Sequence, residues 1–197
     1  MSRDAGVDSG RPELWLARHG QTEWSRTNRH TSVTDLPLTP KGEAAARALA
    51  RRLAGTPFDL VLTSPLRRAR DTARLAGFGD VAVVDADAHE WRYGEVEGLT
   101  TAQVRERIPG WTVWTHPTPG GETAGEVGAR ADRLIERVRR QARQRALLFA
   151  HGHVLRVLTA RWLGFAPEAG AHFVLDVAKL SVLGWEREAP AILLWNA

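Results

Sequence analysis

The stretch Glu13-Leu-Trp-Leu-Ala-Arg-His-Gly-Gln-Thr-Glu23 decides the fold. Residues 14–17 form an apolar run, which is typical of a strand buried on both faces. Gly20, directly after Arg18 and His19, permits a sharp turn and lets a ligand approach the backbone. The sequence therefore places a cation and an imidazole at the carboxyl end of a predicted core strand, where open α/β sheets bind ligands. A surface Arg-His pair satisfied by water is the plainer alternative.

Further strand ends repeat this construction. Apolar strands are predicted at residues 59–63 and 146–150. The first runs into Ser64-Pro65, which reads as a helix start, and the second delivers His151-Gly152. A third short strand, 81–84, leads into the segment that contains Glu90. This repetition favours one functional site over a surface pair.

Strands and helices alternate along most of the chain. Thr39-Pro40 opens one predicted helix, which ends at Gly55, and the capping box from Thr123 to Glu126 opens another that runs to about Arg145. Further strands are predicted at residues 172–176, 180–185 and 191–195, and residues 101–121 fit no regular element. The pattern predicts an α/β fold: a three-layer α/β/α sandwich with a mainly parallel, doubly wound sheet. We expect residues 1–11 to form a flexible tail and residues 12–197 a single domain.

The composition restricts the class of protein. The chain has 43% hydrophobic and 25% charged residues, as expected of a globular protein, and no cysteine. Disulfides, thiolate nucleophiles and cysteine-based zinc sites are therefore excluded, and a cytoplasmic location is expected. No apolar run is long enough to cross a bilayer, and residues 1–11 do not resemble a signal peptide. Of the 27 basic residues only Lys41 and Lys179 are lysines, and arginine suits bidentate recognition of phosphates.

The residues at these strand ends fit a phosphate site. Two imidazoles and two arginines at neighbouring strand ends would form a cationic pocket, and an anion would offset the cost of burying it. A neutral imidazole can attack phosphorus as a nucleophile and form phosphohistidine. Glu90, among glycines and aromatic residues, is the best candidate for the acid that protonates the leaving group. None of these steps needs a metal or another cofactor.

Four blocks of the sequence resemble the signatures of the histidine phosphatase superfamily, the phosphoglycerate-mutase-like group, in its branch 1. They are Arg18-His-Gly-Gln-Thr22, Ser64-Pro-Leu-Arg-Arg-Ala69, Glu90-Trp-Arg-Tyr-Gly94 and His151-Gly152. Residues 90–122 look similar to actinobacterial broad-specificity acid phosphatases of this superfamily. Ser25 stands where the family often has asparagine.

The resemblance implies specific roles. His19 would be the phosphorylated nucleophile and Glu90 the proton donor, with Arg18, Arg68 and His151 binding phosphate. The substrate contacts that it implies come from Arg18, Gln21, Thr22, Ser25, Arg68 and Gly152. Arg67 is expected to face solvent and Glu97 to be structural.

Several side chains are open to two interpretations. His153 is expected to be structural or to support the site, and His30 and His116 either line the substrate mouth or lie in solvated loops. Trp91, Trp111 and Trp114 form either a lid or a small core of their own. The arginines at helical spacing are expected to form a solvated face: Arg130, Arg133, Arg137 and Arg140.

Three functions remain open at this stage. The favoured one is a metal-independent phosphomonoester hydrolase of the acid phosphatase type, acting on small phosphorylated metabolites or sugar phosphates. A phosphoglycerate mutase-type transfer is the second, although the chain has little room for the closing segments of mutases. A non-catalytic phosphate-binding module is the third. The expected partner is a small-molecule substrate, without nucleic acid or membrane, and a homodimer stays open.

Overall fold

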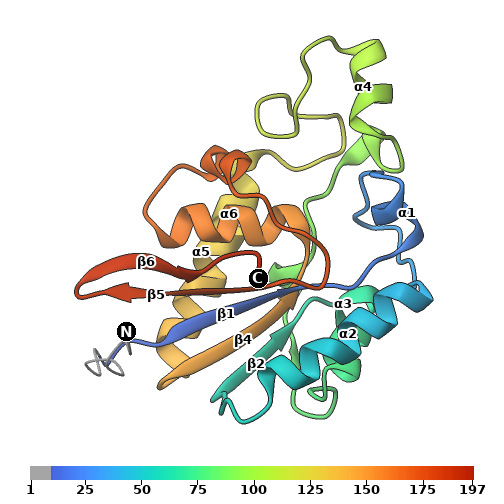
Figure 1. Ribbon diagram of the computed structural model, residues 1–197. Helices are drawn as coiled ribbons and strands as arrows, with labels where there is room; N and C mark the ends of the chain where they lie inside the picture. Colours follow the sequence, from blue (N-terminus) through green and yellow to red (C-terminus); the bar gives the residue numbers. More distant parts are fainter. Residues whose placement is uncertain (1–9) are drawn as a thin grey trace.

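Six strands form one mixed sheet in the computed structural model, which describes residues 10–197 (Figure 1). The strand order is β3-β2-β4-β1-β5-β6, with β3, β2, β4 and β1 parallel and β5 and β6 antiparallel to their neighbours. The predicted mainly parallel sheet is therefore confirmed. The strands are β1 (Glu13–Arg18), β2 (Leu60–Thr63), β3 (Val83–Val84), β4 (Arg145–Ala150), β5 (Leu180–Glu186) and β6 (Ala189–Leu194).

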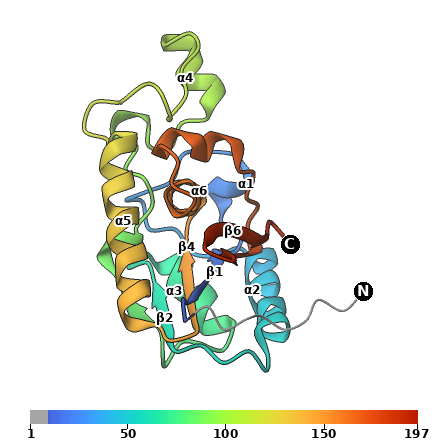
Figure 2. The same cartoon turned by 90° about the vertical axis from the view of Figure 1, so that its left-hand side faces the viewer.

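Helices cover both faces of the sheet, as Figure 2 shows with the strands seen end-on. One face carries α2 (Pro40–Leu53) and α3 (Arg67–Leu75), and the other carries α5 (Ala124–Gln141) and α6 (Gly152–Trp162). Successive residues of a strand point to opposite faces, so β1 serves both layers. Leu14 and Leu16 belong to the core beneath α5 and α6, whereas Ala17 lies in the core beneath α2 and α3.

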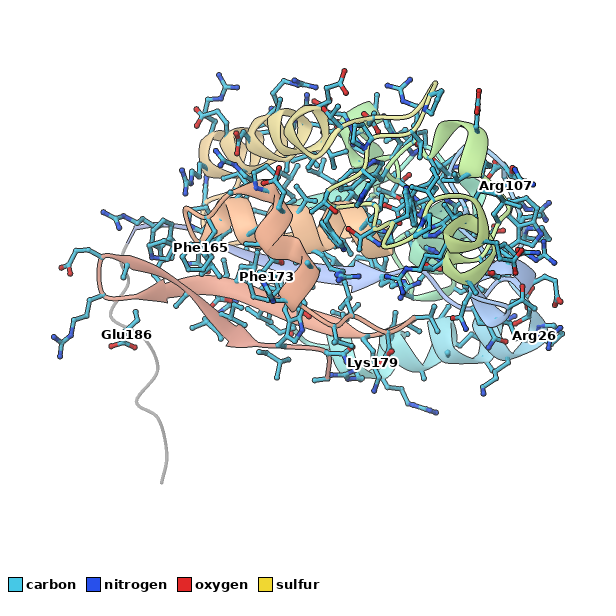
Figure 3. The ribbon with its side chains drawn as sticks, turned by 90° about the horizontal axis from the view of Figure 1, so that it is seen from above. Arg26, Arg107, Phe165, Phe173, Lys179 and Glu186 are labelled. Carbon is cyan, nitrogen blue, oxygen red and sulfur yellow. The ribbon has the colours of Figure 1, made fainter. Side chains whose placement is uncertain are left out.

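Short elements surround the carboxyl ends of the parallel strands. They are α1 (Glu23–Arg26), α4 (Thr101–Arg107) and the 3₁₀ turns η1 (Ala86–Ala88), η2 (Gly94–Val96) and η3 (Pro167–His172). In Figure 3, Arg26 and Arg107 mark this end of the molecule and Glu186 marks the opposite end. The prediction that residues 101–121 form no regular element is wrong for α4, which begins with a capping box between Thr100 and Gln103.

Three predicted helix boundaries hold and two do not. The helix that begins at Pro40 ends at Leu53, and Gly55 follows it with φ 76°. Thr39 caps α2 with Pro40 in its first turn, and Thr123 and Glu126 form the predicted capping box of α5. The predicted helix start at Ser64-Pro65 is wrong, because α3 begins at Arg67 and the Ser64 hydroxyl accepts the Leu66 N–H outside the helix. The predicted extension of α5 to about Arg145 is also wrong. The helix ends at Gln141 because the Asp59 carboxylate accepts backbone N–H bonds from residues 143–145 and turns them into β4.

Two predicted strands are shorter or absent. Of residues 81–84 only Val83 and Val84 pair with β2, since the N–H groups of Val81 and Ala82 bond to the Phe78 carbonyl in a turn. The strand predicted at residues 172–176 is wrong: it overlaps the end of η3 and continues as a loop. That loop brings the Leu175 carbonyl to the site.

Gly20 and Gly42 allow two segments of the main chain, the turn after β1 and the start of α2, to lie in direct contact. A Cβ atom on Gly20 would lie 2.5 Å from the Gly42 carbonyl oxygen, and one on Gly42 would lie 2.2 Å from the Gln21 carbonyl oxygen. The turn after β1 thus rests directly on the first turn of α2.

Two further expectations concern the N-terminal tail and the absence of a membrane-spanning segment. Residues 1–9 of the predicted tail lie outside the described residues, whereas the Arg11 guanidinium lies over the Trp185 ring. Within residues 10–197 no helix combines the length and the apolar character needed to span a membrane.

Candidate active site

His19 directly follows β1, and its imidazole is buried and held in one tautomer. Its backbone N–H bonds to the Ala150 carbonyl of β4 at 3.0 Å, which fixes the residue between the two central strands. Its ring Nδ1 lies 2.7 Å from the Gly20 carbonyl. A carbonyl only accepts, so Nδ1 carries the proton and Nε2 keeps its lone pair. Burial, followed by the positive charges of Arg68 and Arg18, holds the pKa of His19 well below its usual value.

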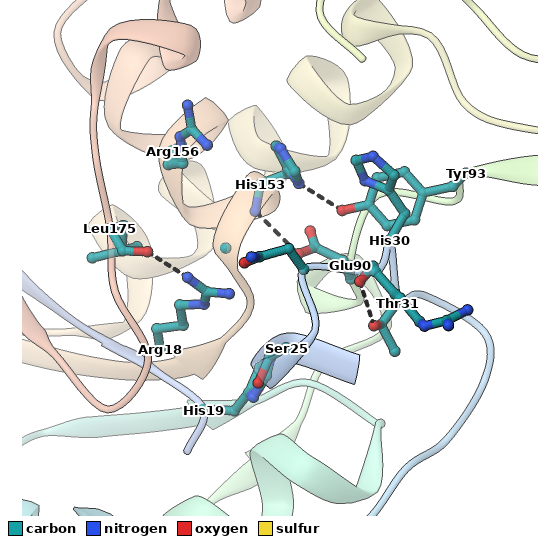
Figure 4. Close-up of a pocket in the computed structure, with 13 residues that line it drawn as sticks. Arg18, His19, Ser25, His30, Thr31, Glu90, Tyr93, His153, Arg156 and Leu175 are labelled. Atoms are coloured by element: carbon teal, nitrogen blue, oxygen red, sulfur yellow. Dashed lines mark hydrogen bonds between the residues drawn. The ribbon is translucent and has the colours of Figure 1, made fainter. Parts of the chain in front are cut away.

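The imidazole faces a cavity of about 180 Å³ at the carboxyl ends of the parallel strands (Figure 4). Of the predicted catalytic residues, Arg18, His19 and Glu90 line it. Its volume suits a phosphate group with a short organic part. Gly152 and Ser25 also line the cavity, together with residues not predicted as ligands: Asn28, Arg29, His30, Thr31, Tyr93, His153, Arg156 and Leu175.

Arg18 is a buried cation that is only partly satisfied by the protein. One terminal nitrogen donates to the Leu175 carbonyl, while Nε is buried and has no hydrogen-bond partner among the described residues. Burial lowers the pKa of Arg18, and the nearby Glu90 carboxylate opposes this shift. A Cβ on Gly152 would lie 3.2 Å from the guanidinium carbon, so glycine at the start of α6 makes room for the cation.

Arg68 and His151 lie behind the cavity wall, both fully buried. Arg68 Nε donates to His151 Nδ1 at 3.1 Å, so that Nδ1 is the acceptor and Nε2 donates to the Ser64 hydroxyl at 2.7 Å. The other Arg68 nitrogens bond to the carbonyls of Thr31, Ser32 and Thr34. Burial and the Arg68 charge hold the pKa of His151 well below its usual value. The pair therefore presents a neutral imidazole whose ring centre lies 5.1 Å from that of His19.

Glu90 is positioned by backbone groups. Its oxygens accept N–H bonds from Trp91 at 2.8 Å, Val154 at 2.9 Å and His153 at 3.0 Å. Two of these donors belong to the first turn of α6, whose N–H groups have no partner within the helix. The Glu90 carbonyl also accepts the Ser32 hydroxyl at 3.3 Å. These contacts aim the carboxyl group at the cavity beside His19.

A buried ion pair holds the segment that carries Glu90. Arg130 donates to both oxygens of Glu122 at 2.8 and 2.9 Å, and its remaining nitrogen bonds to the Asp87 and His89 carbonyls. Glu122 in turn accepts the Arg92 N–H at 2.9 Å. The expectation that Arg130 belongs to a solvated face is wrong, because only 6% of its side chain is exposed. Helical spacing alone does not reveal the loop that covers this end of α5.

Gln21 and Thr22 lie outside the cavity lining, and both side chains hold the loop. The Gln21 side-chain oxygen accepts the Thr39 hydroxyl, and the buried Thr22 hydroxyl caps α1. Ser25 lines the cavity, but its hydroxyl accepts the Thr22 N–H and donates to the Thr22 carbonyl. The Glu97 carboxylate accepts the N–H groups of Ser32 and Thr34, in agreement with a structural role.

The far wall of the cavity consists of residues that sequence reasoning left ambiguous or missed. His30 lines it and His116 does not. Burial lowers the pKa of His30 to about 4. His153 also lines it, and its Nδ1 lies 2.6 Å from the Tyr93 hydroxyl. Trp91 and Trp111 are core residues, each 1% exposed, and do not form a lid. The sequence had singled out His30 and His153 of this wall, whereas Tyr93 and Arg156 were missed.

The arginines around the cavity lack acidic partners. Among residues 10–197, no carboxylate oxygen lies within 4 Å of a side-chain nitrogen of Arg18, Arg29, Arg68 or Arg156. In the same part of the chain no three His, Asp or Glu side chains are arranged to hold a metal ion. The site is therefore a cationic cavity with one carboxylate, Glu90, and is built for an anion.

Comparison with known proteins agrees with this geometry. Residues 14–197 match the family model of the histidine phosphatase superfamily, branch 1. An acid phosphatase of Mycobacterium tuberculosis is 40% identical over 88% of this chain and 86% of its own length. A 2,3-bisphosphoglycerate-dependent phosphoglycerate mutase of Gloeobacter violaceus is 36% identical over 79% of this chain and 77% of its own.

Solved structures show the same relationship. The structure of the product of an open reading frame, Rv3214, of Mycobacterium tuberculosis superimposes with a TM-score of 0.88 at 35% identity. It covers 94% of this chain, and 97% of that chain is matched. The family match, these relatives and the site at the strand ends lead to one conclusion: the chain belongs to the histidine phosphatase superfamily, branch 1, and is an enzyme of that family.

Proposed function

We propose that the protein hydrolyses small phosphomonoesters through a phosphohistidine formed on His19. The observation that carries the proposal is the His19 tautomer: Nδ1 donates to the Gly20 carbonyl, which leaves the Nε2 lone pair available in a cationic cavity. Its lowered pKa keeps this imidazole unprotonated in weakly acidic solution. The acid phosphatase among the relatives supports hydrolysis.

The proposed reaction proceeds in two steps. Substrate phosphate binds beside Arg18 and the first turn of α6, and His19 Nε2 attacks phosphorus as the bond to the leaving oxygen breaks. Glu90 gives a proton to the leaving oxygen, so that an alcohol departs. A water molecule then gives a proton back to Glu90 and attacks phosphohistidine, which releases inorganic phosphate and restores His19.

Arg68 and His151 take part from behind the cavity wall in this proposal. Arg68 holds the His151 ring and the carbonyls of residues 31–34, and its positive charge lies close to the bound phosphate. The Arg18 and Arg68 cations supply the electrophilic stabilisation, so the proposal invokes no metal or other cofactor.

A phosphoglycerate mutase reaction is the second candidate, because mutases occur among the relatives. It shares the phosphohistidine step and differs in the acceptor, which is a hydroxyl of the substrate in place of water. The hydrolase is favoured because the acid phosphatase is 40% identical to this chain and the mutase 36%.

The test is release of inorganic phosphate from p-nitrophenyl phosphate, sugar phosphates and 3-phosphoglycerate with EDTA present, with isomerisation of phosphoglycerate followed in parallel. We expect hydrolysis by the natural sequence and a loss of at least a thousandfold in His19→Ala. His172→Ala, an exposed histidine outside the cavity, is the matched control and should retain full activity. Isomerisation without phosphate release would favour the mutase, and full activity of His19→Ala would refute the nucleophile.

A further inference from the structure

Arg156 extends the cationic wall of the cavity beyond the phosphate position. It lies on α6 four residues after Gly152, and residues four apart on a helix share one face. Gly152 is the residue that packs on the Arg18 guanidinium. In Figure 4, Arg156 and Arg18 occupy the same side of the cavity, with Arg156 farther from His19. The wall thus carries one cation packed against Gly152 and a second on the residue one helical turn farther along α6.

The Arg156 guanidinium is held in place by neutral groups. Nε donates to the Gly170 carbonyl at 3.0 Å and one terminal nitrogen to the Ala171 carbonyl at 3.0 Å. The guanidinium also lies over the Trp114 ring, 4.7 Å from its centre. The second terminal nitrogen, Nη1, makes no hydrogen bond within residues 10–197, and Arg156 lines the cavity. The cation is therefore oriented in advance, with one donor nitrogen unused.

Another arginine of α6, Arg161, differs from Arg156 in having a carboxylate partner. Arg161, five residues farther along, donates to both Asp132 oxygens at 2.9 and 3.0 Å. Arg156 has no such carboxylate among the described residues. A single phosphate on Arg18 and α6 would leave Arg156 without an anion.

We propose that Arg156 binds a second anionic group on the substrate, so that the preferred substrates are phosphomonoesters whose leaving group carries a phosphate or a carboxylate. This inference rests on the proposed hydrolase function and names its substrate class. The oxyanion would accept the Nη1 hydrogens while the transferred phosphate lies against Arg18 and His19. Arg29, which lines the cavity and donates one nitrogen to the Gly98 carbonyl, adds positive charge at the mouth.

Kinetics on matched substrates test the proposal. We expect kcat/KM to be about tenfold to a hundredfold higher for fructose 1,6-bisphosphate or 3-phosphoglycerate than for fructose 6-phosphate or glycerol 3-phosphate, the value of a charge-assisted contact. In Arg156→Met this preference should fall to less than threefold, and in Arg156→Lys it should be intermediate. The control Arg161→Met removes the ion pair between α6 and Asp132 of α5, outside the cavity, and should keep the natural preference. Preference for the bisphosphate identifies phosphate as the second anion, and preference for 3-phosphoglycerate identifies carboxylate.

Binding measurements test the second-anion site independently of the proposed hydrolysis. In the His19→Ala background, calorimetry should show that fructose 1,6-bisphosphate binds at least tenfold more tightly than fructose 6-phosphate, and that adding Arg156→Met removes the difference. Equal binding and equal kcat/KM for singly and doubly charged substrates would overturn the second-anion site while leaving hydrolysis intact. A selective affinity without any hydrolysis would support the site and refute the proposed reaction.

Discussion

At the scale of single residues, Glu90 is the side chain whose surroundings constrain its chemistry most. Three backbone N–H groups converge on its two oxygens. In Glu90→Gln the amide nitrogen would face at least one of these donors, leaving an N–H without an acceptor at a cost of about 1–3 kcal/mol. We expect hydrolysis of alkyl phosphates to fall by about 10²–10⁴-fold and that of p-nitrophenyl phosphate by less than tenfold, because nitrophenolate leaves without a proton. Steady-state kinetics on both substrates measure this, and equal losses would refute Glu90 as the acid.

Gly152 gives a second residue-scale prediction. Its missing side chain leaves room for the Arg18 guanidinium, whose carbon would lie 3.2 Å from an added Cβ. Gly152→Ala should therefore displace Arg18 and raise KM for phosphomonoesters about tenfold, with unfolding little changed. Gly125→Ala is a suitable control, since its added Cβ, in the first turn of α5, would meet only the Thr123 hydroxyl at 3.9 Å. Unchanged KM in Gly152→Ala would show that Arg18 has room to move.

At the scale of elements, the Glu122–Arg130 pair joins α5 to the segment of Glu90. Both side chains are more than 90% buried, and removing one partner of such a pair leaves an uncompensated charge. We expect Arg130→Met to lower the free energy of unfolding by about 3–5 kcal/mol and to reduce kcat as well. Arg133→Met, one helical turn along α5, removes an ion pair with Asp87 in which the arginine is 58% exposed, and should cost less than about 1 kcal/mol. Urea unfolding of both variants measures these losses, and similar losses in the two variants would refute a stabilising role of the buried Glu122–Arg130 pair.

The strands and helices also show which parts of the fold and the site could be predicted from the sequence. The strands ending at Arg18 and Ala150 were predictable, because a strand buried on both faces is a continuous apolar run. The end of α5 was not, because it depends on Asp59, more than eighty residues distant in the chain. In the site, the sequence predicted the residues that belong to local motifs: Arg18, His19 and Glu90, all of which line the cavity. Arg156 and Tyr93 reach the cavity through the packing of loops on α6, which one sequence does not reveal.

At the scale of the whole molecule, buried neutral histidines couple stability to pH. Burial lowers the pKa of His30 to about 4 and holds the pKa values of His19, His151 and His153 well below 6.5. In the unfolded chain these imidazoles titrate near 6.5, so the unfolded state takes up protons first as the pH falls. Stability is therefore complete above about pH 6.5 and decreases below it, by up to about 1.4 kcal/mol per pH unit for each histidine.

Urea unfolding at pH 8, 7, 6 and 5 measures this dependence, and we expect a flat profile above pH 7 and a steep loss below pH 6. Constant stability from pH 7 to pH 5 would contradict it. Because the pKa of His19 lies well below 6.5, we expect the acidic limit of activity to coincide with unfolding and not with titration of His19.

The contact between Gly20 and Gly42 has a consequence for how the sequence can vary. In each case the obstacle to a larger residue is a carbonyl oxygen of the main chain, at 2.5 and 2.2 Å, which no exchange of neighbouring side chains can remove. A saturation library should therefore contain no functional variant at either position, and no second-site suppressor that restores one. The two positions, although 22 residues apart in the sequence, therefore constrain each other, and the loop that carries His19 cannot change at either of them.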